Sequence, residues 1–559
     1  MRKNPWFYAA FLVSLLLKIK PLRPMKFIQG QDRNQATLFP VSLEQAIDPD
    51  NEVRIIDLFV DSLPLKDYGF KADYHETGRP AYRPEDLLKL FIYGYLNKVR
   101  STRDLEKEAR RNIEVMWLLR SLTPDHNTIF RFKDQNKNGI KKVFRATVQI
   151  AKNFDLIGGK LIAGDSTRMR AQNSKKNNYN QAKIDRQLAY IDNRLQEYHQ
   201  QLEQAEKEQD HSNRETLRQA IELQQQRKKG YTQLEKQLAE SGQKQISLSD
   251  KDSRMLMLRN NISEVAYNVQ STVDAKNNIL IDYKVTNEND SAAMGNMVRR
   301  AKSILGTNSF IALYDKGYHS GPEFQVVDKI GVTPLVAIPA PPSTSQAPHP
   351  AYNASQFSWD EQSYSYTCPQ GHALTTTGTW HKKRSSGGRK HYFLMQQFRT
   401  RACKECPVKH LCTKNPKGRL IERTEFTPYI EQNRQNVEKN KELYRRRQAI
   451  TEHPFGTIKR QWGFHYILSK KGMARASADV GFMFIAYNLR RLINLIGKKA
   501  FYNYLNSFIL PIVVFFRVIN EQILKLLLLQ RTRTTGVFDR SSLENWFKFE
   551  TKWQTQSGF

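Results

Sequence analysis

Three acidic residues stand far apart in the chain, and the segments around them could bring them to one metal site. Asp165 and Asp315 each follow a short apolar run, and Glu452 lies in a basic, helix-like segment, 444–459. Two aspartates at strand ends and a glutamate on a helix would supply only hard oxygen ligands. Such ligands suit Mg²⁺ or Mn²⁺. A pair of divalent ions held in this way catalyses in-line attack on phosphodiesters.

The chain carries a strong excess of positive charge. Its 559 residues include 88 Lys and Arg against 55 Asp and Glu, which gives a formal net charge of +33. The excess is spread along the chain, which favours an extended track for nucleic acid over a single basic arm. The alternative interpretation is that this charge only keeps the protein soluble, or that it resembles the charge of ribosomal proteins. Hydrophobic residues make up 39% of the chain, enough for packed cores, so a disordered chain is excluded.

The length indicates several domains, and shifts in composition divide the chain into eight segments. We interpret the first as an upstream extension, because Met25 begins a more ordinary start. The predicted segments are an extension, 1–24; a helical DNA-binding domain, 25–150; the first part of a catalytic core, 151–180; a helical hairpin, 181–245; the core continued, 246–339; a cysteine-containing insertion, 340–425; core helices with Glu452, 426–504; and a tail, 505–559.

Short basic helices are predicted in the 25–150 segment. A helix opens at Pro84, and a second is expected over 103–119, capped by Ser101 or Thr102 with Glu106 early in the helix. Another turn and cap at 124–128 leads into a third helix. Three short helices with many arginines are typical of a helix-turn-helix DNA-binding unit, with a helical docking domain as the alternative. The arginines expected to contact DNA are Arg100, Arg103 and Arg110.

The core segments predict an α/β fold with a mixed five-stranded sheet and helices on its faces. Three strands are followed by a helix, a strand, a helix and a strand, which is the order of a ribonuclease-H-like fold. In that order, Asp165 and Asp315 end neighbouring strands, whereas Asp274 ends a strand on the far side. The strands are expected at 159–170, 265–274, 279–285, 310–315 and 333–338, and the helices at 291–305 and 322–330.

A heptad-like seam occupies the 181–245 segment. Its apolar positions follow a 4-3-4-3 spacing until the polar run 210–213 breaks it, and a looser seam then resumes. We expect two helices folded back as an antiparallel hairpin within one chain, with dimerisation as the alternative, because the break has the composition of a turn. The first seam consists of Ile184, Leu188, Ile191, Leu195, Tyr198, Leu202 and Ala205.

Several motifs together resemble the DDE transposases of bacterial insertion sequences, over residues 25–500. The group with a Tyr-Arg-Glu-Lys signature is the most similar, here Tyr444, Arg447, Glu452 and Lys459, although Arg447 and Glu452 are separated by one residue more than in that pattern. The other motifs are Tyr82-Arg83-Pro84 to Asn112, Gly164-Asp165-Ser166-Thr167, Tyr267-Asn268-Val269-Gln270, Asp315-Lys316-Gly317-Tyr318 and Glu452-x-Pro454-Phe455-Gly456-x-Ile458-Lys459.

The resemblance implies an enzyme that cuts DNA at transposon ends and transfers the strands into target DNA. Asp165, Asp315 and Glu452 would hold Mg²⁺ or Mn²⁺, and Tyr444, Arg447 and Lys459 would contact DNA. Double-stranded DNA is the expected partner, with a homodimer during synapsis, in the bacterial cytoplasm at the nucleoid and with no membrane partner. Two alternatives stay open: a ribonuclease-H-like nuclease that does not join strands, and an inactive DNA-binding derivative.

The spacing around Glu452 adds two expectations of its own. Glu452 and Lys459 are two helical turns apart and would share one face, so that the lysine could meet a DNA phosphate while the glutamate holds a metal. Pro454 removes a backbone donor, so a kink or restart of the helix is expected near Glu452.

The four cysteines fall within one short window of the 340–425 segment. Such clustering indicates a metal clip in a reducing compartment rather than a disulfide framework. Four thiolates suit structural Zn²⁺, although the spacing is irregular for a zinc ribbon and His372 or His410 could replace a cysteine. Free thiols are the alternative. The cysteines are Cys368, Cys403, Cys406 and Cys412.

Overall fold

The computed structural model describes residues 42–71, 81–258, 262–340, 343–384, 392–468 and 471–508. The predictions for residues 1–24 and for most of the 505–559 tail lie outside these residues. The chain divides into two units at Asp48, and every element named below belongs to the second unit. Within the described residues, no helix is both long and apolar enough to cross a membrane.

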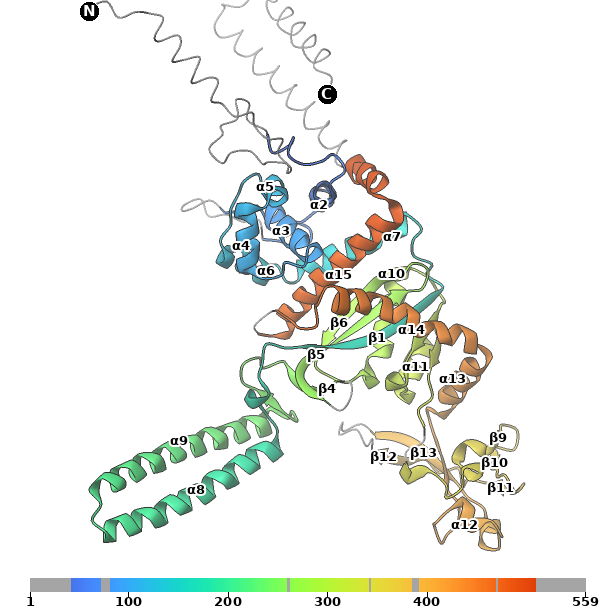
Figure 1. Ribbon diagram of the computed structural model, residues 1–559. Helices are drawn as coiled ribbons and strands as arrows, with labels where there is room; N and C mark the ends of the chain where they lie inside the picture. Colours follow the sequence, from blue (N-terminus) through green and yellow to red (C-terminus); the bar gives the residue numbers. More distant parts are fainter. Residues whose placement is uncertain are drawn as a thin grey trace, which may run out of the picture. The chain divides into compact units, whose positions relative to one another are not determined.

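A six-stranded mixed sheet forms the centre of the fold (Figure 1). Its order is β4-β5-β1-β7-β8, and β6 pairs with the same edge of β5 as β4. β5 is antiparallel to β1, β4 and β6, whereas β7 is parallel to β1 and to β8. The predicted mixed α/β core is therefore confirmed, and β4 is an additional strand. The strands are β1 (Leu161–Arg170), β4 (Arg254–Met257), β5 (Ser263–Asp274), β6 (Ile279–Thr286), β7 (Ile311–Tyr314) and β8 (Thr333–Val336).

Helices bury the central strands. Every residue of β5 from Val265 to Asp274 is buried, as expected for a strand covered on both faces. Aromatic rings join the layers: Tyr283 of β6 packs edge-on against Phe144 and Phe484, with ring centroids 5.1 and 5.3 Å apart. The helices that contact the sheet are α7 (Gly139–Asn153), α10 (Met294–Leu305), α11 (Gly321–Lys329), α13 (Thr427–Lys439), α14 (Lys441–Phe455) and α15 (Met473–Ile496).

The N-terminal part is helical, as predicted, but two local predictions are wrong. A single helix over 103–119 does not form, because the Asn112 side chain accepts the N–H groups of Glu114 and Val115 and so begins a new helix. Ser101 makes no side-chain cap, and Glu106 instead accepts hydrogen bonds from the backbone and ring of His126. The helices are α2 (Glu52–Asp61), α3 (Pro84–Leu96), α4 (Thr102–Arg111), α5 (Ile113–Leu118) and α6 (His126–Gln135).

A buried polar cluster joins these helices to α15. Asp479 of α15 has no solvent exposure, and its carboxylate lies 2.7 Å from Arg100 Nη2 and 3.6 Å from Lys133 Nζ. Tyr95 of α3 donates its hydroxyl to the same carboxylate. Phe91 and Phe482 stack nearby, with centroids 4.8 Å apart. Helix α15 therefore contacts both α3 of the N-terminal part and β6 of the sheet.

Residues 181–241 form two long helices that pack against each other (Figure 1). They are α8 (Gln181–Lys207) and α9 (His211–Ser241). Asp210 caps α9 by accepting the N–H of Asn213 at 3.0 Å, so the polar break in the seam forms the turn. Lys228 and Asp192 form a 2.7 Å ion pair across the two helices. The two predicted helices therefore pack against each other within one chain.

A small module of short strands follows the sheet, and we call residues 343–424 the cysteine module. Its core consists of few residues: Phe357, Tyr366, Leu374, Phe398 and Ile421. Two three-stranded sheets and a short helix build the module: β9 (Ser358–Asp360), β10 (Ser365–Thr367) and β11 (Ala373–Leu374); β12 (His381–Arg384), β13 (Tyr392–Phe398) and β14 (Ile421–Thr424); and α12 (Lys409–Cys412).

Candidate active site

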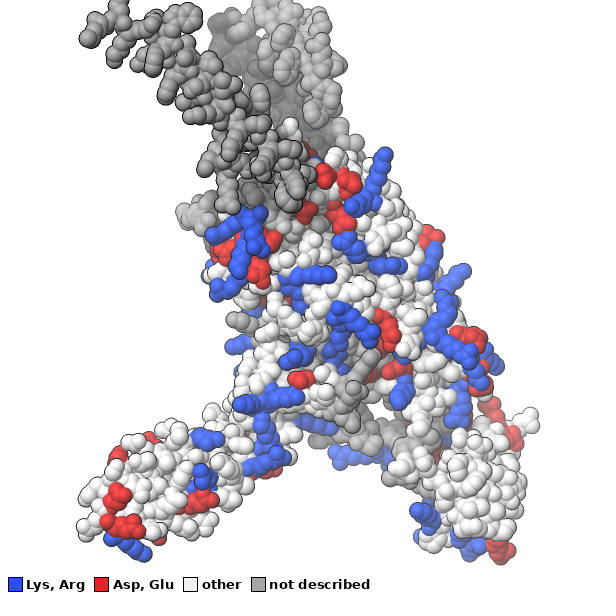
Figure 2. Space-filling view, viewed as in Figure 1, with Lys and Arg blue, Asp and Glu red and all other residues white. Residues whose placement is uncertain are grey.

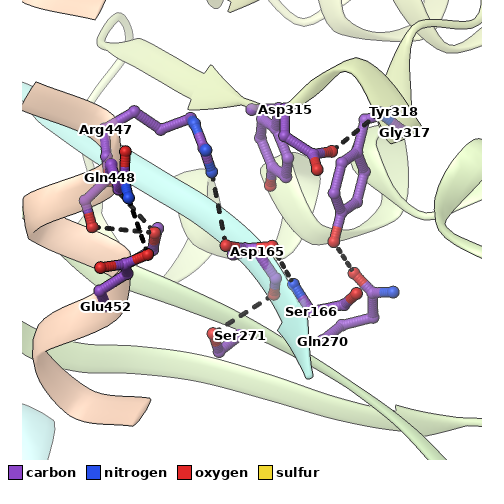
Figure 3. A network of polar contacts seen from close by, with 12 residues as sticks. Asp165, Ser166, Gln270, Ser271, Asp315, Gly317, Tyr318, Arg447, Gln448 and Glu452 are labelled. Atoms are coloured by element: carbon purple, nitrogen blue, oxygen red, sulfur yellow. Dashed lines mark hydrogen bonds and ion pairs between the residues drawn. The ribbon is translucent and has the colours of Figure 1, made fainter. Parts of the chain in front are cut away.

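Asp165 and Asp315 lie at the same level on two neighbouring parallel strands (Figure 3). In the register of β1 with β7, Ala163 lies opposite Leu313, and each aspartate stands two residues further along its strand direction. Parallel neighbours are about 4.8 Å apart, so the two aspartates lie near each other at this edge of the sheet. Asp315 then caps a short 3₁₀ turn, η4 (Lys316–Tyr318), by accepting the Gly317 N–H at 2.9 Å.

The residue before Asp165 must be small. A Cβ at Gly164 would lie 2.1–2.5 Å from the ring and hydroxyl of Tyr314, closer than any side chain can approach. The Tyr314 ring is buried at 1% exposure, so it has little room to withdraw. Glycine at 164 therefore lets the two strands and the Tyr314 ring pack closely directly beneath the two carboxylates.

Asp165 is a desolvated carboxylate with one cationic neighbour. Its Oδ1 accepts the Ser166 N–H at 2.7 Å, and its Oδ2 lies 3.4 Å from Nη1 of Arg447. Burial raises the pKa of Asp165 above its ordinary value, and the charge of Asp315 acts in the same direction, while Ser166 and Arg447 oppose the shift. Two carboxylates that repel each other in a partly buried place form a suitable site for a cation.

Helix α14 brings the remaining predicted residues to this edge. The Tyr444 hydroxyl donates to the Tyr314 carbonyl at 2.9 Å, and Arg447 one turn later reaches Asp165. Thr451, four residues after Arg447, is buried on the same face. Glu452 lies one position further round the helix, is exposed, and accepts a hydrogen bond from Gln448 Nε2 at 2.9 Å. The additional residue between Arg447 and Glu452 therefore turns the glutamate away from the face that Arg447 and Thr451 occupy.

The helix does not restart at Pro454, which lies inside it. α14 continues to Phe455, and a π-helical turn follows over Gly456–Gln461. Lys459 lies in this turn, and its Nζ donates to Thr167 Oγ1 at 2.9 Å and to the Arg168 carbonyl at 3.3 Å. The lysine therefore stands at the outgoing part of β1, two to three residues beyond Asp165.

Asp290 is a further acidic residue at the site that the sequence analysis missed. Its carboxylate accepts hydrogen bonds from Asn268 at 2.8 Å and Gln270 at 2.7 Å, and pairs with Arg168 at 3.2 Å. Gln270 in turn accepts the Tyr318 hydroxyl at 2.5 Å. A Cβ at Gly317 would be 3.1 Å from Asp315 Oδ1 and 3.7 Å from Asp290 Oδ2, so both carboxylates border the same turn. In the sequence, Asp290 is only an aspartate just before a predicted helix. Aspartates are common at helix caps, so this position alone does not indicate a functional site.

The predicted DNA-contacting arginines divide into two groups. Arg103 and Arg110 are exposed on α4, and Arg110 pairs with Glu106 at 2.8 Å. Arg100 is only 5% exposed and is held by Asp479 and by the Tyr466 carbonyl, so the expected DNA contact is corrected to a structural role.

Asp274 is also structural, since its carboxylate accepts the N–H groups of Gly158, Gly159 and Lys276. Lys and Arg side chains are spread over the visible face among fewer acidic ones (Figure 2).

No three His, Cys, Asp or Glu side chains among the described residues are already grouped closely enough to hold a metal ion. The donor set at the sheet edge nevertheless fits a hard cation, because two carboxylates leave adjacent strands and a third stands on the helix that packs across them. For the three carboxylates to bind one cation, the Glu452 side chain has to turn from Gln448 towards Asp165. The 3.4 Å contact between Arg447 and Asp165 also has to lengthen.

Comparisons with known proteins point to mobile DNA elements. A family model described as a transposase domain (DUF772) matches residues 41–135, and one described as a transposase DDE domain matches residues 367–493. The second match contains Glu452 but neither aspartate. No curated protein matches the chain. A solved synaptic complex of the piggyBac transposase with hairpin DNA aligns over 81% of this chain and 79% of that chain, with 9% identity and a TM-score of 0.27, which is too low to indicate a shared fold.

Proposed function

Because the chain is a DDE transposase of insertion-sequence type, we propose that it cleaves DNA at transposon ends and joins the freed strands to target DNA through Asp165, Asp315 and Glu452. The observation that carries the assignment is the pair of aspartates at one level on adjacent parallel strands, with α14 packed across them. Mg²⁺ or Mn²⁺ is the proposed cofactor, because every ligand is a carboxylate oxygen.

The proposed catalytic core is ribonuclease-H-like. The order β6-β5-β1-β7-β8, with the first three strands antiparallel and the last three parallel, supports this assignment. The α8–α9 pair then enters between β1 and β5, and the cysteine module enters between β8 and α14. We propose both as insertions into the core, the first between Asp165 and Asp315 in sequence and the second between Asp315 and Glu452.

In this mechanism the protein supplies position and charge. Asp165 and Asp315 would hold the cations from the sheet, and Glu452 would complete the set from the helix. Bound divalent ions supply an activated water and neutralise the charge that develops on the phosphodiester. Arg447 pairs with Asp165 and would have to yield this contact for Asp165 to hold a cation, and Lys459, beside Thr167, is placed to meet a DNA phosphate. No side chain is needed as a covalent nucleophile, because the freed 3′-OH attacks the target strand. Two transposon ends would be held by two copies of the chain.

The test uses the full-length protein and duplexes copied from the DNA that flanks its gene. With Mg²⁺ the wild type should nick these duplexes and join them to a plasmid, and Asp165→Asn, Asp315→Asn and Glu452→Gln should each abolish both steps while retaining binding in gel shifts. Glu442→Gln is the matched control, because Glu442 is an exposed glutamate on the same helix. Nicking without joining would support a nuclease instead, and cleavage retained by Asp165→Asn would reject the site.

Metal binding is measured separately from activity. Titration of DNA-free protein with Mn²⁺, followed by electron paramagnetic resonance, should show binding that each of the three variants weakens and Glu442→Gln leaves unchanged. Equal Mn²⁺ binding by wild type and Asp165→Asn would show that the carboxylates do not hold the cation.

A further inference from the structure

The four cysteines of the chain all line one small cavity in the cysteine module. Its volume is about 30 Å³, which is enough to hold a water-sized or ion-sized occupant. Cys368 and Cys412 also pack against the small hydrophobic core beside it. None of the residues described as lining the cavity is an aspartate or a glutamate. A space of this size and lining can accept an ion bound by sulfur.

Two backbone turns fix the cysteines around this cavity. After Cys368 the chain reverses, because Cys368 N–H donates to the His372 carbonyl at 2.9 Å and Gly371, with φ +80°, donates back to the Cys368 carbonyl at 2.8 Å. The His372 N–H points at Cys368 Sγ, 3.4 Å away. Backbone N–H groups directed at sulfur stabilise a thiolate, which is the form that binds metals.

The second turn carries the other three cysteines. Cys403 lies in the 3₁₀ turn Arg401–Lys404, Cys406 precedes α12, and Cys412 ends it. The Lys409 N–H donates to the Cys406 carbonyl at 3.1 Å, which closes the loop between them. One cysteine from a reversed turn and three from a second tight segment therefore line the same cavity.

The surroundings are close-packed and positively charged. A Cβ at Gly418, where φ is +90°, would lie 2.6 Å from Cys403 Cβ, so the returning chain passes directly behind this cysteine. Arg419 donates to the Cys412 carbonyl at 3.3 Å, and its guanidinium lies over the Phe357 ring at 5.8 Å. A cationic side chain at this place offsets the negative charge of several thiolates.

We propose that Cys368, Cys403, Cys406 and Cys412 together bind one structural Zn²⁺, independently of the chemistry at the sheet edge. Among the described residues, the buried hydrophobic cluster of the module has five members, which is few for a free-standing fold, and small modules are commonly stabilised by a bound metal. His410 does not line the cavity, and His372 lines it but is exposed, whereas all four cysteines line it and are partly buried, which favours the cysteines as the ligands. These side chains are not yet grouped for a metal among the described residues, so zinc binding would require the Sγ atoms to move together within the cavity.

The chain has no cysteine outside this cluster, so thiol chemistry reports on the site alone. Full-length protein purified without chelator should contain one zinc per chain by mass spectrometry of the metal. Its four thiols should react slowly with Ellman's reagent and quickly once a strong chelator is added. Co²⁺ exchanged into the protein should give the absorption of a tetrahedral thiolate site.

Single variants identify the ligands. Cys403→Ser and Cys406→Ser should each lose zinc, whereas His372→Ala and His410→Ala should retain it. Because a serine variant could fail through misfolding, the wild-type measurements decide the matter. Four rapidly reacting thiols in folded wild-type protein, or a zinc content equal to that of Cys403→Ser, would overturn the proposal. Zinc lost on His372→Ala would replace one cysteine ligand by histidine and contradict the four-cysteine site.

Discussion

Replacing Asp479 by asparagine should remove a negative charge that faces two buried cations. The carboxylate lies 2.7 Å from Arg100 and 3.6 Å from Lys133, whose side chains are 5% and 7% exposed. Asparagine has nearly the same size and can still accept the Leu468 N–H, which lies 2.9 Å from the carboxylate. The substitution therefore tests the charge rather than the packing.

The expected loss of unfolding free energy is about 3–5 kcal/mol, because a buried ion pair that loses one partner leaves the other charged and desolvated. The matched control is Asp155→Asn. Asp155 pairs with Lys276 at 2.8 Å, but its side chain is 90% exposed, and such pairs contribute about 1 kcal/mol or less. Two ion pairs of similar length should thus differ several-fold in their contribution, because burial differs.

Urea unfolding of the full-length protein, followed by far-ultraviolet circular dichroism, measures both variants. Combining Asp479→Asn with Arg100→Met should cost less than the sum of the two single changes, because the second change removes a stranded charge. A loss below about 1 kcal/mol for Asp479→Asn would refute the idea that buried charges couple the N-terminal helices to α15.

The pH dependence supplies a second check on the same residue. Burial alone would raise the pKa of Asp479, but the Arg100 and Lys133 charges outweigh it and hold the pKa below the ordinary value of 3.8. A lowered carboxylate pKa stabilises the fold above the unfolded value, and this contribution is lost as pH falls through the folded value. The difference between wild type and Asp479→Asn should therefore stay constant from neutral pH down to about pH 4 and shrink only below it.

Three further predictions concern the site and its supports. Gly164→Ala should abolish cleavage and lower the urea midpoint while preserving DNA binding in gel shifts, because the new Cβ would overlap the Tyr314 ring; full cleavage by this variant would contradict the close packing at the strand. Asp290→Asn should lower Mn²⁺ affinity or cleavage by about 10–100-fold, since it supports the Gln270–Tyr318 contact beside Asp315, and unchanged values in both assays would show that Asp290 plays no part. Burial lowers the pKa of Lys141 from 10.5 to about 8, so the folded protein binds fewer protons than the unfolded chain between these values and its stability should rise with pH there. Lys141→Met should remove this rise in urea midpoints measured across the same range, and an identical slope in both proteins would exclude Lys141 as its source.

The central strands and the two aspartates could be predicted because their signals are local. An apolar run that ends in an acidic residue predicts a strand end wherever the strand lies in the sheet, and the helix–strand order then places β1 beside β7. The seam of α8 and α9 is equally local, since its period and its polar break are both visible within sixty residues.

The misses depend on distant partners or on side-chain orientation. Arg100 looks like any basic residue before a helix, and only Asp479, 379 residues later, explains its burial. The orientation of Glu452 follows from one additional residue of helix and from its bond to Gln448, which no spacing rule predicts. The break at Asn112 was a local signal, because asparagine is a favoured cap, but the apolar periodicity on either side suggested continuity.

The π-helical turn that follows α14 changes the direction in which the side chains after Phe455 point. A wider turn contains more residues for the same advance, so Lys459 points elsewhere than it would on an unbroken α-helix, while Glu452 upstream is unaffected. The angle around the helix axis between the Glu452 and Lys459 side chains therefore depends on this π-helical turn as well as on the number of residues between them. Deleting one residue from Gly456–Gln461 would restore α-helical hydrogen bonding in this turn. The Lys459 side chain would then move away from Thr167, while the three carboxylates would stay unchanged.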